Sequence, residues 1–158
     1  GHRVMLQSLE LKIPPPIVAL LCAAGMWAIA HYSAPYVLSP AMRWALVAIY
    51  AVLGVAFDFA GLLAFRQSRT TFNPLHPEKS SALVTHGIYR ITRNPMYCGM
   101  ASLLLAWAAY LQSPLSVAGV LAFIGYITQF QIKPEERMLE QLFGDEFNRY
   151  RMQVRRWL

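Results

Sequence analysis

Charged side chains are scarce in this chain of 158 residues. Asp, Glu, Lys and Arg make up 14% of the sequence, whereas soluble domains carry about 25%. Apolar residues are correspondingly abundant at 56%, and the mean hydropathy is +0.37. Both departures argue against a soluble enzyme and favour a membrane protein. The length predicts one domain, residues 1–158.

Acidic residues are scarcer than basic ones, with 8 Asp and Glu against 14 Lys and Arg and a net charge of +6. An excess of this sign in a soluble protein would suggest a nucleic-acid partner. Here the basic residues lie between and after long apolar runs, as in the cytoplasmic loops of membrane proteins. We therefore expect the membrane as a partner and no nucleic acid.

Cysteine is nearly absent. Cys22 and Cys98 both lie in apolar surroundings, which favours small buried side chains over a disulfide framework. The sequence predicts no metal site.

Long apolar runs occur four times, and each predicts a membrane-spanning helix. The runs cover residues 17–30, 44–65, 96–111 and 115–132. Lys133 and Pro134 are expected to end the fourth run, and a helical pattern of apolar residues follows from 135 to 143. The predicted fold class is an all-α membrane protein with about four transmembrane helices and a cytosolic C-terminal helical segment.

Basic residues also predict the orientation of the chain. Lys and Arg concentrate in segments 66–93 and 133–158, whereas segment 112–114 has none and segment 31–43 has only Arg43. By the positive-inside rule, the central loop and both termini are cytoplasmic. We expect an integral protein of the cell inner membrane.

The last part of the chain is strongly basic. Gly144 fits the C-cap of the preceding helix, and Asp145 is expected to cap a final one. This final segment carries the arginines Arg149, Arg151, Arg155 and Arg156. A basic amphipathic end of this kind suits an anionic membrane surface.

Asp58 is the one charged residue of the run 44–65. A carboxylate at that depth costs about 2.5–3.5 kcal/mol on insertion scales, so it should face other helices or a polar cavity. Two interpretations stay open: Asp58 contacts a substrate or cofactor, or it is a neutral or hydrogen-bonded packing residue.

The stretch from residue 87 to residue 99 crowds polar and special residues between apolar runs. Its glycines permit close approach of the backbone to a ligand, and its arginines supply fixed positive charge for a carboxylate or phosphate. The residues concerned are Gly87, Tyr89, Arg90, Arg93, Asn94, Pro95, Tyr97 and Gly99. The alternative is an interfacial loop whose arginines reach lipid head groups and whose tyrosines join an aromatic belt.

Glu135 and Glu136 follow the fourth run directly, in a region that is otherwise basic. Acidic residues are common in a first helical turn because they complement the helix dipole. The functional alternative is a pair that holds an ammonium group or ribose hydroxyls, or that orients a substrate.

Two separated motifs resemble one known superfamily. The run LVTHGIYRITRNPMYCG, residues 83–99, resembles the signature L-V-t-x-G-x-Y-x-x-x-R-[HN]-P-x-Y-x-G of the isoprenylcysteine carboxyl methyltransferase and phospholipid methyltransferase superfamily. Glu135, Glu136 and Leu139, followed by FGDEF and Tyr150, resemble its E-E-x-x-L…F-G-x-E-[YF]-x-x-Y tail. The motifs occur in order with the expected hairpin between them, and the motif-bearing part is 71–158.

This resemblance implies an integral membrane methyltransferase that uses S-adenosylmethionine and a lipophilic acceptor. It assigns cofactor binding to Leu83, Val84, Gly87, Tyr89, Asn94, Pro95, Tyr97, Glu135 and Glu136. It assigns catalytic roles to Arg93, Asn94, Glu135 and Glu136. Eukaryotic carboxyl methyltransferases have histidine at the position of Asn94, and asparagine does not titrate, which argues against a general base there.

The methyl acceptor stays open among a prenylcysteine-like carboxylate, a lipid amine and a small thiol. Two other functions are alternatives. One is an NADPH-dependent membrane reductase, because broader relatives of the superfamily include sterol reductases. The other is a non-catalytic membrane scaffold or transporter with Asp58 as its polar residue.

Overall fold

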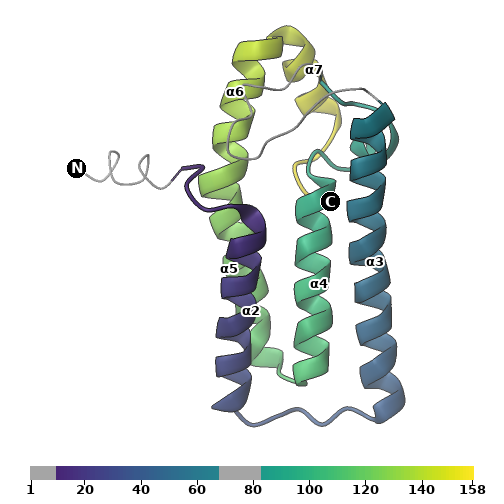
Figure 1. Ribbon diagram of the computed structural model, residues 1–158, viewed down its shortest axis with the longest axis vertical. Helices are drawn as coiled ribbons and strands as arrows, with labels where there is room; N and C mark the ends of the chain where they lie inside the picture. Colours follow the sequence, from purple (N-terminus) through teal and green to yellow (C-terminus); the bar gives the residue numbers. More distant parts are fainter. Residues whose placement is uncertain (1–9, 68–82) are drawn as a thin grey trace, which may run out of the picture.

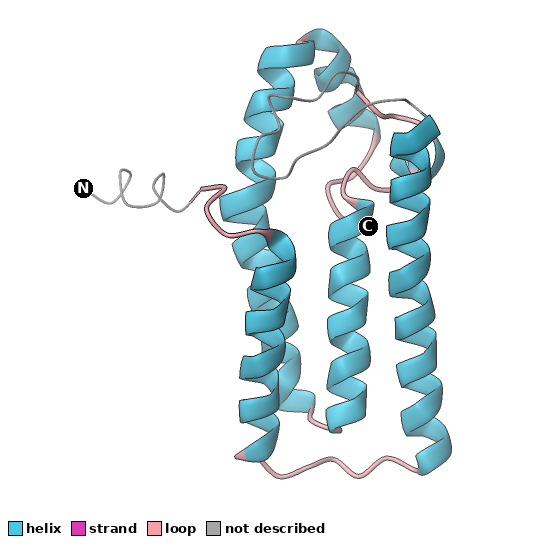
Figure 2. Cartoon of the chain, in the orientation of Figure 1, coloured by secondary structure: helices cyan, strands magenta, loops and turns pink. Residues whose placement is uncertain are grey.

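The computed structural model describes residues 10–67 and 83–158, and within these ranges every regular element is a helix (Figure 2). The helical fold class is therefore confirmed for the described residues. The helices are α2 (Pro15–His31), α3 (Pro40–Gln67), η2 (Gly87–Arg90), α4 (Pro95–Leu111), η3 (Pro114–Ser116), α5 (Val117–Ile127), η4 (Thr128–Ile132), α6 (Lys133–Phe143) and α7 (Asp145–Gln153). The central loop between the second and third runs falls largely on residues 68–82, outside the described residues, as does the start of the motif-bearing part.

Helices α2, α3, α4 and α5 run side by side along the long axis of the molecule (Figure 1). The connections α2–α3 and α4–α5 lie at one end of this bundle (Figure 1). At the other end, α6 extends beyond α5, and α7 folds back from it (Figure 1). Helix α4 begins at this same end (Figure 1). The core between α2, α4 and α5 is closed by side chains such as Met26, Phe123 and Ile127, which are fully buried.

Glycines bring α3 and α4 into close contact. A Cβ atom at Gly54 would lie 2.8 Å from the carbonyl oxygen of Gly99, and one at Gly99 would overlap the carboxylate of Asp58. Gly99 was expected to let the backbone approach a ligand. It instead lets α4 approach α3, because small residues allow helix backbones to come close together. Asp58 faces this contact, where its Oδ1 is buried without a hydrogen-bond partner among the described residues.

Within the described ranges, two helical runs are long and apolar enough to cross a membrane: α3 and the continuous run Pro114–Phe143. Helix α3 exposes large apolar side chains along much of its length, among them Val52, Phe59 and Leu62. An exposed apolar surface of this extent is rare on soluble monomers. Helices α2 and α4 have 17 residues each, at the short end of the range of roughly 17–25 for a span.

The fourth apolar run was expected to end at Lys133 and Pro134, but the helix itself continues through both residues to Phe143. Proline normally breaks a helix, since it lacks an N–H and its ring clashes with the carbonyl four residues earlier. Here the preceding turn, Thr128–Ile132, is a π-helix, whose i→i+5 pattern is wider. This wider turn lets Pro134 occupy the start of α6 without ending the run.

Gly144 joins α6 to α7 in a single residue. It is the C-cap of α6, as predicted, and its φ of +54° and ψ of −122° favour glycine. Gly144 is also the N-cap of α7, so Asp145 stands in the first turn and not at the predicted cap position. A carboxylate in that turn still complements the helix dipole.

Candidate active site

A cavity of about 420 Å³ lies where α3, α4, α6 and α7 meet. Ligand sites typically measure roughly 300–1,000 Å³. The predicted site residues that line it are Leu83, Val84, Tyr89, Arg93, Asn94, Pro95, Tyr97, Glu135 and Glu136. The fold therefore brings both sequence motifs, which lie far apart in the chain, to one cavity.

Gly87 does not belong to the described lining of this cavity. It is exposed and opens η2 with a φ of +63°, a conformation that L side chains rarely adopt. This conformation explains why position 87 is a glycine. The turn directs Tyr89 inward, where the Tyr150 hydroxyl donates a hydrogen bond to the Tyr89 carbonyl at 2.6 Å.

Glu135 links the two motifs physically. It is buried, and its Oε1 accepts hydrogen bonds of 2.6 Å from the Tyr97 hydroxyl on α4 and 2.6 Å from the Gln131 amide on η4. Gln131 was not among the predicted residues. Its signal in the sequence is an amide within an apolar run, four positions before Glu135.

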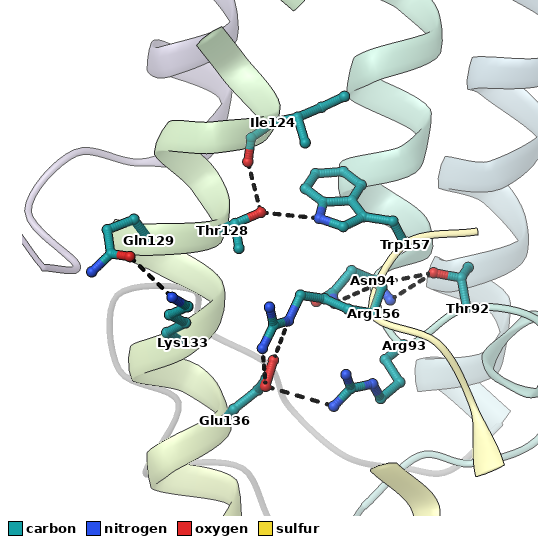
Figure 3. A network of polar contacts seen from close by, with 10 residues as sticks. All are labelled: Thr92, Arg93, Asn94, Ile124, Thr128, Gln129, Lys133, Glu136, Arg156 and Trp157. Carbon is teal, nitrogen blue, oxygen red and sulfur yellow. Dashed lines mark hydrogen bonds and ion pairs between the residues drawn. The ribbon is translucent and has the colours of Figure 1, made fainter. Parts of the chain in front are cut away.

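Glu136 lies between two guanidinium groups, as Figure 3 shows. Arg156 holds it at two points, with Nε at 2.6 Å from Oε1 and Nη2 at 3.0 Å from Oε2. Arg93 is more distant, with Nη1 at 3.6 Å from Oε2. The buried Nε and Nη1 atoms of Arg93 have no hydrogen-bond partner among the described residues.

Residues 154–158, here called the C-terminal strap, run back to the start of α4. The backbone N–H of Arg93 donates to the Arg155 carbonyl at 2.8 Å, and the Asn94 amide donates to the Arg156 carbonyl at 2.9 Å. The Trp157 indole donates to Thr128 Oγ1 on η4 at 3.0 Å (Figure 3). The strap thereby connects the entrance of α4 to the helix that carries both glutamates.

The strap corrects one prediction. Arg156 was grouped with arginines facing a membrane surface, but its side chain turns inward to a buried carboxylate. Nothing in the sequence separates it from Arg155, whose side chain is exposed. Only the path of the backbone after α7 decides which of the two faces the site.

The charges immediately around Glu136 are unbalanced. Arg93, Arg156 and Glu136 place two guanidinium groups beside one carboxylate. Burial lowers the pKa of Arg93, and the hydrogen bond to Glu136 raises the pKa of Arg156, but guanidinium groups stay protonated in proteins. This cluster therefore presents an excess positive charge, which suits an anionic group of a ligand.

The phenols at the cavity are neutral. Burial raises the pKa of Tyr89 and of Tyr150, so their hydroxyls keep their protons, and that of Tyr150 donates to the Tyr89 carbonyl. Much of the remaining lining is apolar and includes Leu62, Phe65, Met96, Met100 and Ile132. Among the described residues, no group of three or more His, Cys, Asp or Glu side chains is arranged to hold a metal ion.

Comparison with known proteins gives several matches. An uncharacterized protein of Haemophilus influenzae is 51% identical over 63 residues, which are 40% of this chain and all of that protein. Protein-S-isoprenylcysteine O-methyltransferase A of Arabidopsis thaliana is 28% identical over 102 residues, 65% of this chain and 52% of the relative. A probable protein-S-isoprenylcysteine O-methyltransferase of Oryza sativa subsp. indica is 27% identical over 106 residues, 67% and 56% respectively.

The matched region thus spans about half the length of the plant relatives. No solved structure matches the chain. The profile of the family described as phospholipid methyltransferase matches residues 42–146, more than half of the sequence. This match confirms the superfamily that the two motifs resemble. The chain belongs to the phospholipid methyltransferase family.

Proposed function

We propose that this protein transfers a methyl group from S-adenosylmethionine to a lipophilic acceptor at the cytosolic face of a membrane. One observation carries the proposal: residues of both motifs line a single cavity, and one of them, Arg93, has two guanidinium nitrogens without a hydrogen-bond partner among the described residues. Family membership makes methyl transfer the expected chemistry. The cavity residues explain how this chain would perform it.

The residues present fit the methyl donor. Its carboxylate matches the guanidinium of Arg93, which lines the cavity, since guanidinium groups bind carboxylates with directional, charge-assisted hydrogen bonds. Its ammonium and sulfonium groups are cationic. Burial raises the pKa of Glu135 to about 8, and a cation beside this side chain favours its ionised, carboxylate form. Its adenosine part matches the apolar and aromatic surface offered by Leu83, Val84 and Tyr89.

The donor, when bound, supplies a methyl group activated by a positively charged sulfur. An electron pair of the acceptor forms the new bond to the methyl carbon while the carbon–sulfur bond breaks and its electrons stay on sulfur. The chain contributes alignment and exclusion of water, which are sufficient for much of the acceleration of such a displacement. Arg93 fixes one end of the donor, and Glu135 is held rigid by Tyr97 and Gln131.

Proton transfer depends on the acceptor. A carboxylate or thiolate attacks without losing a proton, so Asn94, which does not titrate, is no obstacle. An amine must first become neutral, and a carboxylate such as Glu135 is the group in this cavity that accepts that proton. The acceptor classes are therefore a prenylcysteine-like carboxylate, a lipid amine and a small lipophilic thiol.

A membrane setting accounts for the apolar part of the cavity. With α2 to α5 as four spans and the basic segments in the cytosol, the polar donor enters from water. Leu62 and Met100 belong to α3 and α4 and line the same cavity. They offer the acceptor an apolar path from the bilayer.

Calorimetric titration of the detergent-purified protein with S-adenosylhomocysteine, with NADPH as the control ligand, tests this function. We expect binding of S-adenosylhomocysteine alone, followed by transfer of label from methyl-labelled donor to extracted lipids. Binding of NADPH alone would support the reductase instead. Absence of binding by either ligand would refute the proposed site.

A further inference from the structure

The C-terminal strap contacts the cavity through residues that do not line it. Arg156 lies behind Glu136 and is 33% exposed at its side chain, whereas the side chains of Glu136 and Arg93 are each 11% exposed. Arg156 does not itself belong to the described lining of the cavity. Any effect of Arg156 on a ligand must therefore act through Glu136, to which it is hydrogen-bonded.

Two arginines lie near the Glu136 carboxylate, but only Arg156 makes hydrogen bonds to it. Arg156 makes two short hydrogen bonds, one to each carboxylate oxygen, in a side-on geometry. Such two-point pairs fix orientation as well as charge. Arg93 stays at 3.6 Å, beyond hydrogen-bond distance, and keeps its Nε and Nη1 donors unused.

The strap is itself anchored, which gives the Arg156 guanidinium a defined place. The Arg156 carbonyl accepts from the Asn94 amide and from Thr92 Oγ1 at 3.2 Å, and Trp157 is bound to Thr128 on the π-turn. These contacts hold the backbone on the C-terminal side of Arg156 (Figure 3), and the hydrogen bond from the Arg93 N–H to the Arg155 carbonyl holds it on the other side.

We infer that Arg156 is a positioning residue that occupies Glu136 so that the Arg93 guanidinium stays available to the carboxylate of the methyl donor. The inference rests on the proposed function. Without Arg156, the described cation nearest to Glu136 is Arg93, and the buried carboxylate draws it from 3.6 Å into hydrogen-bond contact. The Arg93 guanidinium is then engaged by Glu136 instead of by a ligand.

If Arg156 has this positioning role, its removal should weaken the binding of ligands that carry a carboxylate and not of ligands that lack one. The experiment compares S-adenosylhomocysteine with its decarboxylated analogue, which lacks only that group, by calorimetric titration of the unaltered chain and of Arg156→Ala. We expect Arg156→Ala to lose roughly tenfold or more in affinity for S-adenosylhomocysteine, the range for a charged hydrogen bond. Its affinity for the decarboxylated analogue should change by no more than about twofold, because that ligand does not use the interaction.

Arg155→Ala is the matched control. It removes the same charge from the neighbouring position of the strap, but the Arg155 side chain is exposed and only its backbone carbonyl is used. Both affinities should stay at the value of the unaltered chain. Arg156→Lys keeps the charge without the two-point geometry, and we expect a smaller loss that is again confined to the carboxylated ligand.

The outcomes separate the two proposals. No binding of S-adenosylhomocysteine by the unaltered chain overturns the proposed function, and the inference falls with it. Binding by the unaltered chain, with equal losses for both ligands in the Arg156 variants or with no loss, overturns the inference alone. Thermal unfolding and circular dichroism check that each variant is folded. If Arg156→Ala does not fold, the same comparison made on Arg156→Lys decides.

Discussion

The two ends of the helical bundle each hold an arginine against α4, and the two are satisfied in opposite ways. Arg43 donates from Nε and Nη2 to the Tyr110 carbonyl at 3.0 and 2.6 Å. Its guanidinium also lies over the rings of Trp44 and Tyr110, at 5.4 and 4.7 Å from their centroids. At the other end, the buried Nε and Nη1 atoms of Arg93 have no hydrogen-bond partner among the described residues, and Nη1 lies 3.6 Å from Glu136 Oε2.

This difference distinguishes an anchor, an arginine that fixes two helices to each other, from a receptor, an arginine that binds a ligand. The hydrogen bonds of Arg43 end on a backbone carbonyl, so it fixes the beginning of α3 to the end of α4. A buried donor without a partner has a cost in stability, and such a group persists where a ligand supplies the missing partner. On this argument Arg43 serves the fold and Arg93 serves the site.

Arg93→Ala should have the largest effect on ligand binding. Hydrogen bonds to charged groups contribute about 1.5–3 kcal/mol, so affinity for S-adenosylhomocysteine should fall by about 10- to 150-fold. Calorimetric titration measures the change, with Arg43→Ala as the control that should bind as the unaltered chain does. Similar losses in the two variants would remove the distinction between anchor and receptor.

Tyr97→Phe should come next, and its effect is on stability. It removes a hydroxyl that donates to the buried Glu135, and a buried acceptor that loses a donor costs about 1–3 kcal/mol. Tyr126→Phe is the matched control, because the Tyr126 hydroxyl is buried with no partner among the described residues. Thermal unfolding in detergent should show a clear loss for Tyr97→Phe and none for Tyr126→Phe. Equal shifts would mean that the Tyr97 bond contributes no more than a hydroxyl without a partner.

The sequence was sufficient to predict which segments meet at the cavity. The stretch around Arg93 and the pair Glu135 and Glu136 carry residue types that are rarely placed beside apolar runs without a reason, and both belong to motifs of one superfamily. The helical runs followed from hydropathy alone. These features are local, so they are visible in one sequence.

What could not be predicted depends on contacts between distant segments. The π-turn at Thr128–Ile132 has no sequence signal that distinguishes it from an ordinary helical turn. Gly87 and Gly99 looked alike as small residues of one motif, but one is needed for a positive φ and the other for contact with α3. The contact between Arg156 and Glu136 depends on the backbone turning back after α7, which the sequence does not indicate.

Arg43→Ala should have a smaller effect than either change at the cavity. Arg43 is only half-buried, so the loss of its hydrogen bonds and ring contacts should lower the free energy of unfolding by about 0.5–1.5 kcal/mol. Arg43→Lys should recover part of this, since a cation over the rings remains. Thermal unfolding gives the ranking. A stability loss larger than that of Tyr97→Phe would make the connection end, and not the cavity end, the more tightly held part of the fold.

Asp58→Asn should have the smallest effect. Asp58 lies against Gly99 between α3 and α4, and it does not belong to the described lining of the cavity. Asparagine has nearly the same shape and carries no charge, so packing should persist. Methyl transfer and S-adenosylhomocysteine affinity should both stay within about twofold, since surroundings without a partner give the carboxylate no interaction to lose. Loss of transfer with cofactor affinity intact would instead assign Asp58 to the acceptor's path, and the apolar face between α3 and α4 would then be part of the site.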